Sequence, residues 1–259
     1  MSVPAGDGSH TGRRVLVTGA ASGIGRATSA WLADRGALIA GVDRDAEQLE
    51  RASRLWATPR SVAIAADVSD EAQVLSAVDR AVESLGSLDA VINVAGVGGY
   101  TGDVGATTAA EWRNVIDVNL TGVFLVCHCA VPHLRDADGG SIVNVGSQYG
   151  LVGCIGSPAY VAAKAGVIGL TRAMALDHAQ ENIRVNCVCP GPVDTPMREA
   201  GSAPGVWHDL EMARTRGRLP LGRPGAPVEI AAVIGFLASE QAAYMTGAII
   251  PVDGGWTAA

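Results

Sequence analysis

The sequence is poor in features that mark several classes of protein. Aromatic residues make up only 4% and charged residues 17% of the 259, whereas apolar residues make up 48%. The high apolar share excludes a largely disordered chain. Acidic residues outnumber basic ones, the formal net charge is -7, and no basic cluster is present, so nucleic acid is not an expected partner.

The cysteines and the N-terminal residues suggest a cytoplasmic location. The cysteines number five, at positions 127, 129, 154, 187 and 189, which indicates no disulfide framework. Cys127 and Cys129 flank a histidine, but residues two apart on a helix face different sides, so we expect no metal. The first 14 residues lack the apolar core of a signal peptide, and no apolar run approaches 18 residues, so no membrane partner is expected.

Short β-rich runs alternate with longer helical patterns along the chain. The expected strands are residues 14–18, 37–42, 61–66, 89–94, 141–145, 183–188 and 248–252. The expected helices lie near residues 23–35, 45–54, 70–85, 108–135, 158–180 and 226–239. Several strands are continuously apolar, as in parallel sheets covered on both faces. The order predicts an α/β fold: a Rossmann-type doubly wound parallel sheet of about seven strands with helices on both faces.

We expect a single dinucleotide-binding catalytic domain, because no linker divides the chain. A flexible tail is predicted over residues 1–11 and the domain over residues 12–259. Residues 195–225 break the alternation with a charged stretch that is punctuated by glycine and proline. Long connections in compact domains are often lids or binding loops, so we predict a substrate-binding loop here, with a solvated insertion as the alternative.

A glycine-rich turn joins the first expected strand to the first helix. Gly19, Gly23 and Gly25 have the spacing G-xxx-G-x-G. Such a turn lets the backbone approach a pyrophosphate and directs a helix N-terminus at it. The spacing is not that of G-x-G-x-x-G, and the lysine of a P-loop is missing.

Acidic residues follow the second and third strands. Asp43 lies about 20 residues beyond the glycines, where a carboxylate binds ribose hydroxyls and repels a 2′-phosphate. Arg44 could accept that phosphate instead, but the carboxylate favours NAD over NADP. Asp67 is similarly placed for the adenine. The alternative role for both carboxylates is to cap the next helix, which Asp45 could do in place of Asp43.

The segment Pro158-Ala-Tyr-Val-Ala-Ala-Lys-Ala-Gly166 carries two reactive groups in apolar surroundings. Ser157 and Pro158 indicate a helix start, so Tyr160 and Lys164, four residues apart, share one helix face. An ammonium near a phenol lowers the phenol's pKa from its reference value of about 10. The pair therefore predicts a general acid/base that is usable near neutral pH.

Ser147 ends the fifth strand, thirteen residues before Tyr160. Ligands bind at the carboxyl ends of such strands, so Ser147 could donate a hydrogen bond to a substrate oxygen. Its surroundings are not the G-x-S-x-G of a nucleophile. Candidate substrate-pocket residues are Gln148, Tyr149, Val152, Cys154, Pro192 and Trp207. They suggest a small-molecule substrate, a hydrophobic or cyclic secondary alcohol or ketone.

With these motifs the sequence resembles the short-chain dehydrogenase/reductase family, in its shorter single-domain branch, over residues 13–255. The matching motifs are Thr18–Gly25, Asp67, Asn93–Gly96, Asn119, Ser147, Tyr160-xxx-Lys164, Pro190-Gly191 and Val252–Gly255. The resemblance implies an enzyme acting on a CH–OH group with NAD, and a homotetramer.

The family's site residues carry over to matching positions. Tyr160 would be the catalytic acid/base, Lys164 would bind the nicotinamide ribose, and Ser147 would orient the carbonyl. Asn119 would hold a water of a proton relay, and Thr195 would contact the carboxamide. The implied cofactor-binding set is Gly19, Ser22, Gly23, Ile24, Gly25, Asp43, Arg44, Asp67, Val68, Asn93, Ala95, Gly96, Tyr160, Lys164, Pro190, Gly191, Val193 and Thr195.

Two other functions remain open. Some relatives reduce 3-oxoacyl thioesters, mostly with NADPH, and Asp43 argues against that cofactor. A protein that binds NAD without turnover is the other alternative. The intact set of Asn119, Ser147, Tyr160 and Lys164 argues against this second alternative.

Overall fold

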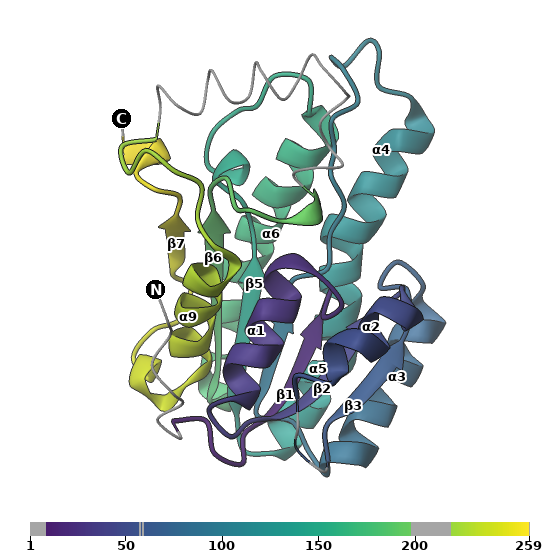
Figure 1. Cartoon of the computed structure of the whole chain (residues 1–259), viewed down its shortest axis with the longest axis vertical. Helices are drawn as coiled ribbons and strands as arrows, with labels where there is room; N and C mark the ends of the chain where they lie inside the picture. The colour runs from purple at the N-terminus through teal and green to yellow at the C-terminus, as the bar shows by residue number, and fades with distance from the viewer. Residues whose placement is uncertain (1–8, 57, 59, 198–218, 259) are drawn as a thin grey trace.

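Seven parallel strands form the centre of the structure, a computed structural model that describes residues 9–56, 58, 60–197 and 219–258 (Figure 1). The strands are β1 (Arg14–Thr18), β2 (Leu38–Asp43), β3 (Val62–Ala65), β4 (Ala90–Asn93), β5 (Gly140–Val145), β6 (Ile183–Pro190) and β7 (Ile249–Val252). Their order is β3-β2-β1-β4-β5-β6-β7, and every neighbouring pair is parallel. The predicted doubly wound sheet is confirmed.

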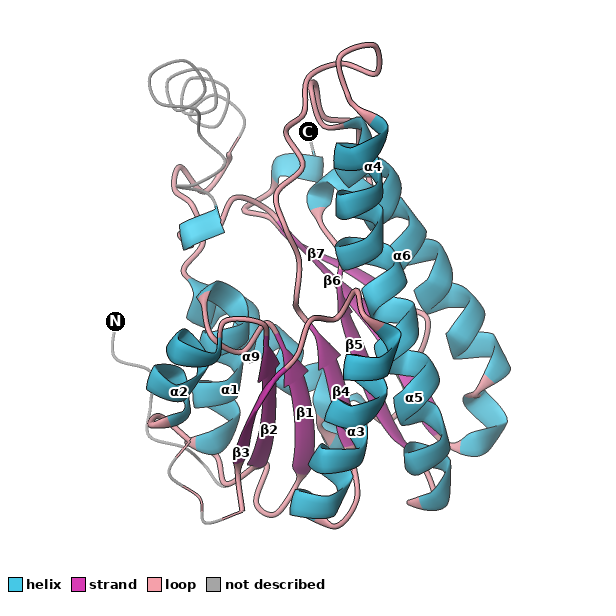
Figure 2. Ribbon diagram, turned by 90° about the vertical axis from the view of Figure 1, so that its right-hand side faces the viewer, coloured by secondary structure: helices cyan, strands magenta, loops and turns pink. Residues whose placement is uncertain are grey.

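Helices cover both faces of the sheet (Figure 2). One face carries α1 (Gly23–Ala33), α2 (Ala46–Ser53) and α9 (Pro227–Ala238). The other carries α3 (Glu71–Leu85), α5 (Gly122–Asp136), which continues α4 (Ala109–Ile116), and α6 (Pro158–Asp177). After β3 the chain returns to β4 on the far side of β1. The carboxyl ends of β1 and β4 therefore form the switch point at which such folds bind ligands.

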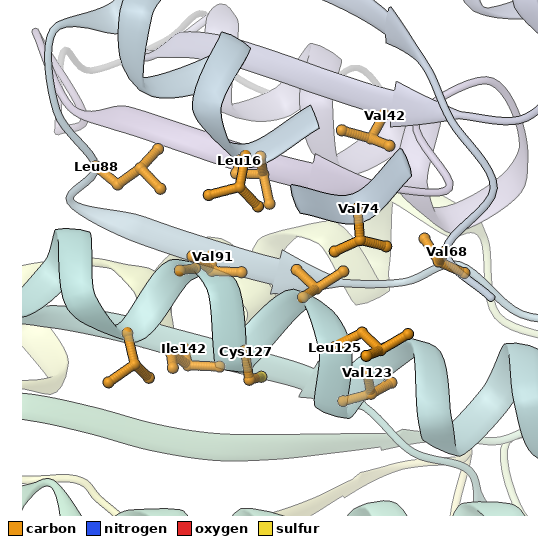
Figure 3. Packing of buried hydrophobic residues seen from close by; sticks show 14 of the residues in the cluster. Leu16, Val42, Val68, Val74, Leu88, Val91, Val123, Leu125, Cys127 and Ile142 are labelled. Atoms are coloured by element: carbon orange, nitrogen blue, oxygen red, sulfur yellow. The ribbon is translucent and has the colours of Figure 1, made fainter. Parts of the chain in front are cut away.

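Two apolar cores hold the helices on the sheet. Figure 3 shows the core beneath α3 and α5, where Leu16, Val91 and Ile142 from three strands meet Val74 and Val123 from the helices. Each of these side chains is at most 4% exposed. Burial of such a side chain is worth about 1.5–3 kcal/mol, so packing on the sheet rather than helix propensity fixes the helices.

The helix predicted over residues 108–135 is not one regular helix. A π turn, η1 (Asp117–Thr121), separates α4 from α5, and the N–H of Gly122 donates to the carbonyl of Asp117 five residues earlier. Within the turn, Asn119 Nδ2 donates to the carbonyl of Val115. A regular helix would offer that carbonyl to the backbone N–H of residue 119. Turns of this kind are frequent at functional sites.

The prediction of a flexible tail is wrong at residues 9–11. His10 is 1% exposed, its N–H donates to the carbonyl of Arg35, and its ring meets Trp31 edge-on at 5.6 Å. A ring contact and a backbone hydrogen bond therefore fix this part of the segment, whereas residues 1–8 lie outside the described ranges. The segment 195–225 is described only over residues 195–197 and 219–225. Its last residue, Gly225, is hydrogen-bonded to the chain just before the segment, with Asp194 N donating to Gly225 O and Gly225 N donating to Pro192 O.

By length and composition alone, Ala109–Asp136 and Pro158–Asp177 could each cross a membrane. The core helices of a soluble protein pass the same test, and here both segments lie against the sheet and contribute to its core.

Gly41 in β2 provides a test of how tightly the α2 side is packed. A Cβ at this position would collide with the ring of Trp56, which is 2% exposed. We expect G41A to lower the free energy of unfolding by about 1–3 kcal/mol, measured by urea denaturation. As a control, Gly169 in α6 is exposed with no atom near its missing Cβ, so G169A should raise stability by up to about 1 kcal/mol. A G41A variant as stable as the wild type would contradict this packing.

Candidate active site

A cavity of about 710 Å³ opens at the carboxyl ends of the strands. It extends along the sheet edge from Asp43, at the end of β2, to Pro190, at the end of β6, with Tyr160 of α6 also in its wall. Apart from Asn93, every residue of the predicted cofactor-binding set lines it, as do Asn119 and Ser147. The sheet thus gathers residues from the whole length of the chain into one site.

The glycine turn leaves room for a phosphate group. Gly19 and Gly23 have positive φ angles of 68° and 50°, and a Cβ at Gly25 would collide with the carbonyl oxygen of Gly19. Ser22 precedes α1 but makes no capping bond with its side chain. The first N–H groups of α1 are therefore not taken by a side-chain cap, and residues 22–25 line the cavity. Such an N-terminus suits a pyrophosphate.

Asp43 does not cap α2. That role belongs to Asp45, whose side chain accepts a hydrogen bond from Gln48 N at 2.9 Å. The carboxylate of Asp43 instead accepts hydrogen bonds of 3.1 Å from Ala21 N and Asp45 N. It therefore ties the glycine turn to β2 and lines the cavity, which fits the predicted position of a ribose ligand.

Asp67 is held in the same way. Its carboxylate accepts hydrogen bonds from the N–H and hydroxyl of Ser69, while Asp70 caps α3. The hydrogen bonds from Ser69 lower the pKa of Asp67, and the nearby positive charge of Arg44 lowers it further. Asp67 and Arg44 both line the cavity, so the guanidinium of Arg44 lies near the ionised carboxylate of Asp67.

Ser147 and Tyr160 come together at the end of β5. Burial raises the pKa of the Tyr160 phenol, and a hydrogen bond with Ser147 acts in the opposite direction. The hydroxyl oxygen of Ser147 also accepts a hydrogen bond from Tyr149 N at 3.1 Å. The net effect is a raised pKa, so the phenol is protonated at neutral pH and can act as an acid, whereas the spacing suggested a phenolate.

The amine of Lys164 lies over the ring of Tyr160 and is hydrogen-bonded to the sheet. Its Nζ lies 5.7 Å from the centre of the Tyr160 ring and donates to the carbonyl of Val145 at 2.9 Å. The residue is 4% exposed, and burial lowers the pKa of its amine to about 8. A spacing of four residues therefore brings the two side chains onto one face, with the amine over the tyrosine ring and its hydrogen bond made to Val145.

Asn119 holds the loop that follows β4. Its Nδ2 donates to the carbonyls of Val97 and Val115, and its Oδ1 accepts from Val97 N at 3.2 Å. The side chain is fully buried and lies so close to Gly96 that a Cβ there would be 2.6 Å from Oδ1. The observed contacts are those of a positioning residue, and the water relay stays a prediction.

Two expected residues do not line the cavity. Asn93 is 2% exposed, and its Nδ2 donates to Cys127 Sγ and to Asn144 Oδ1, which places it inside the core. Its side chain therefore does not face the cavity, and its contact with a cofactor stays a prediction. Val152 lies outside the cavity and is 41% exposed, because the loop after β5 turns it outward. Of the other predicted substrate residues, Gln148, Tyr149, Cys154 and Pro192 line the cavity, and Trp207 lies outside the described residues.

The sequence reasoning missed Trp256, which lines the cavity from the turn after β7. Its ring meets Tyr149 edge-on, with 6.5 Å between centroids. The carboxylate of Asp253 accepts from Gly255 N and Thr257 N and so fixes this turn. β7 runs parallel to β6 and ends at the same edge of the sheet, where ligands bind. The position of Trp256 directly after Val252–Gly255 was therefore a signal that it lines the cavity.

The charge state of Lys164 can be measured directly, because it is the only lysine in the sequence. Protein labelled with [15N]lysine should show one side-chain amine resonance that titrates near pH 8, since burial disfavours the charged form. The amine should thus be charged below that pH and neutral above it. A midpoint near 10.5 would show that the amine is solvated and not held at Val145.

The chain matches known proteins over nearly its whole length. A family model described as enoyl-(acyl carrier protein) reductase matches residues 19–257. Cis-4-hydroxycyclohexanecarboxylate dehydrogenase of Sinomonas cyclohexanicum is 44% identical over 248 residues, 95% of this chain and 97% of the relative. The 3-oxoacyl-[acyl-carrier-protein] reductase FabG of Thermotoga maritima is 41% identical, with 94% and 97% covered.

Solved structures agree with these matches. The crystal structure of levodione reductase is 38% identical and has a TM-score of 0.92, covering 96% of this chain and 99% of that one. The sequence motifs, the sheet and the cavity lead to the same conclusion: the chain belongs to the short-chain dehydrogenase/reductase family.

Proposed function

We propose that the protein is an NAD-dependent dehydrogenase that interconverts a secondary alcohol and a ketone. The observation that carries this proposal is that Ser147 and Tyr160 lie in the same cavity as the glycine turn and Asp43, with the Ser147 hydroxyl close enough to affect the pKa of the phenol. Two hydroxyl groups at one point suit a single substrate oxygen. The relatives described above carry the names of dehydrogenases and reductases, which supports the reaction class.

The cofactor half of the cavity fits a nicotinamide dinucleotide. The free N-terminus of α1 would hold the pyrophosphate, and Asp43 would hold the adenosine ribose. When bound, the cofactor supplies the hydride chemistry. Arg44 is the one cation available for a 2′-phosphate among the described residues at this end, and the carboxylates of Asp43 and Asp67 oppose that phosphate. Two carboxylates against one guanidinium at this end favour NAD over NADP.

The chain's own residues act on the substrate oxygen and its proton. In ketone reduction, Tyr160 donates its phenolic proton to the carbonyl oxygen while Ser147 donates a hydrogen bond to the same atom. In alcohol oxidation, the phenolate takes the hydroxyl proton back. Lys164 places a positive charge behind the tyrosine below about pH 8, its amine being fixed by Val145. No metal ion is needed in this scheme.

The substrate half of the cavity is mostly apolar. Its walls include Tyr149, Ile155, Pro192, Met197 and Trp256, and Ile155 is 67% exposed at the rim. Such walls favour a hydrophobic or cyclic substrate. The similarity to proteins named for a hydroxycyclohexanecarboxylate and for levodione supports a ring compound.

Reduction of 3-oxoacyl thioesters with NADPH is the second candidate function. The similarity to a 3-oxoacyl-[acyl-carrier-protein] reductase favours it, and Arg44 is placed to meet a phosphate. The two candidates differ in cofactor, so the cofactor measurement described below separates them.

We also propose that the protein is a homotetramer. Trp112 of α4, Phe124 of α5 and Leu176 of α6 are 42%, 49% and 82% exposed. Large apolar side chains on neighbouring helices often mark a contact between subunits. Light scattering after gel filtration would give the number of subunits.

Tyr160→Phe tests the proton transfer. Loss of the phenolic proton should lower kcat about 100- to 10,000-fold for any secondary alcohol or ketone, the usual contribution of a general acid/base. Tyr244, which is fully exposed, provides the matched control, and Y244F should keep wild-type turnover. Retention of a tenth of the wild-type turnover by Y160F would refute the assignment of Tyr160.

Asp43→Asn tests the cofactor preference. The wild type should have a lower Kd for NADH than for NADPH. D43N should reduce the ratio of these two Kd values by about tenfold or more, because the charge that repels a 2′-phosphate is gone. Energy transfer from tryptophan to the nicotinamide and the thermal shift should agree, since a ligand of the native state stabilises it. D70N, at the cap of α3 and outside the cavity, is the control. Preference of the wild type for NADPH would instead favour oxoacyl reduction.

A further inference from the structure

Two cysteines lie against the end of β5, and the catalytic scheme does not use them. Cys187 and Cys189 are both fully buried in β6, on the same face of the strand, with 3.8 Å between their Sγ atoms. Neither residue lines the cavity. A buried cysteine usually serves as a small apolar side chain. Here the two thiols face the backbone that leads to Ser147.

The backbone of Gly146 packs against both thiols. β6 pairs with β5 in parallel, and Gly146 N donates to the carbonyl of Val188 at 2.8 Å, between the two cysteines. A Cβ at Gly146 would lie 2.9 Å from Cys187 Sγ and 3.0 Å from Cys189 Sγ. The sulfur atoms thus occupy the space that a side chain at Gly146 would need. The thiol pair therefore limits how closely the end of β5 approaches β6.

The two thiols are not equivalent. Their hydrogen bond raises the pKa of Cys187 and lowers that of Cys189, so Cys187 is the donor and Cys189 the acceptor. Burial opposes the lowering at Cys189, and the N–H of Ser147 is close enough to lower the pKa of this thiol further. Sulfur accepts hydrogen bonds, although weakly. The acceptor of the pair thus lies beside the backbone of the residue that orients the substrate oxygen.

The amine of Lys164 lies on the other side of the same backbone. It donates to the carbonyl of Val145 at 2.9 Å. Burial lowers the pKa of the amine to about 8, and the nearby charges of Cys187 and Cys189 act to raise it. The end of β5 is therefore held from two elements, by the thiols of β6 and by the amine of α6.

We propose that Cys189 is a positioning residue for the reaction: its sulfur, oriented by Cys187, accepts the N–H of Ser147 and so holds the Ser147 hydroxyl at the substrate oxygen. Cys189 does not line the cavity, so its effect on the rate passes through Ser147. This inference rests on the proposed dehydrogenase function and adds a residue from a strand that supplies no catalytic group.

Cys189→Ala tests the contact. The variant removes the acceptor, so kcat for cyclohexanol or 2-butanol at pH 7 should fall about 3- to 10-fold, the effect of one lost hydrogen bond. KM should change by less than about twofold, because Ser147 acts on the oxygen in the transition state. Hydrogen exchange of the Ser147 amide, measured by mass spectrometry of overlapping peptides, should be faster in C189A than in the wild type.

Cys189→Ser provides the conservative rescue. A hydroxyl keeps an acceptor at this position but does not ionise near neutral pH. C189S should therefore restore kcat and the slow exchange of the Ser147 amide. In both variants the [15N]lysine midpoint of Lys164 should fall below its wild-type value, because the thiolate that favours the charged amine is gone.

Cys127→Ala is the matched control. Cys127 is also buried, but it belongs to α5 and packs in the core beneath that helix. C127A removes a buried thiol that is not among the groups acting on Lys164, so kcat, the exchange of the Ser147 amide and the Lys164 midpoint should all stay at their wild-type values.

Three results would overturn the proposal. A lower melting temperature of C189A with unchanged kcat and unchanged exchange would make Cys189 a packing residue only. Equal losses of kcat in C189A and C189S would show that the position needs a sulfur atom of a certain size and not an acceptor. An unchanged Lys164 midpoint in C189A would contradict the placement of the thiol at the end of β5.

Failure of the proposed function gives a different pattern. The wild type would then turn over no secondary alcohol or ketone with either cofactor, and the inferred role in the reaction would fail with the function. Amide exchange and the lysine midpoint need no substrate, so a change of both in C189A would separate this case from the absence of the thiol contact.

Discussion

The amine of Lys164 inside the fold is the constraint on which the site depends. An ionised amine away from water is costly unless it is hydrogen-bonded, and here the carbonyl of Val145 provides the bond. Val145 is the last residue of β5, so the same contact positions Gly146 and Ser147 against α6. Gly150 lets the backbone of the next turn approach Lys164 closely enough for this arrangement. The lowered pKa of the lysine follows from its place between helix and sheet.

The two halves of the cavity are built differently. At the proposed nucleotide end, backbone N–H groups of α1 would meet the pyrophosphate, so a chain of net charge -7 could accommodate an anionic cofactor without a basic surface. At the catalytic end, a few uncharged polar groups project from apolar walls. Apart from the amine of Lys164, charge would be costly there, so orientation falls to the hydroxyl groups of Ser147 and Tyr160.

The sequence predicted the fold well because its strands are apolar and alternate with helices at regular intervals, which leaves little choice of architecture. The catalytic side chains were predictable since they lie at strand ends or share a helix face. Asn93 was not, because a strand-end asparagine can face the cavity or the core, and only its bonds to Cys127 and Asn144 decide this. The spacing of four residues predicted that Tyr160 and Lys164 lie close together. It could not predict which atom the amine of Lys164 binds, because the carbonyl of Val145 belongs to β5 and not to the helix.

The π turn between α4 and α5 frees a backbone carbonyl for a side chain. It closes through a hydrogen bond over five residues instead of four, so this segment holds one residue more than a regular helix would. Deleting one residue from 117–121 would restore the regular ladder, in which the carbonyl of Val115 accepts from a backbone N–H and not from the side chain of Asn119. The bonds of Asn119 to Val97 would then be lost, and with them the anchor of the loop after β4. Changes of length in this segment should therefore be tolerated less well than changes of residue type.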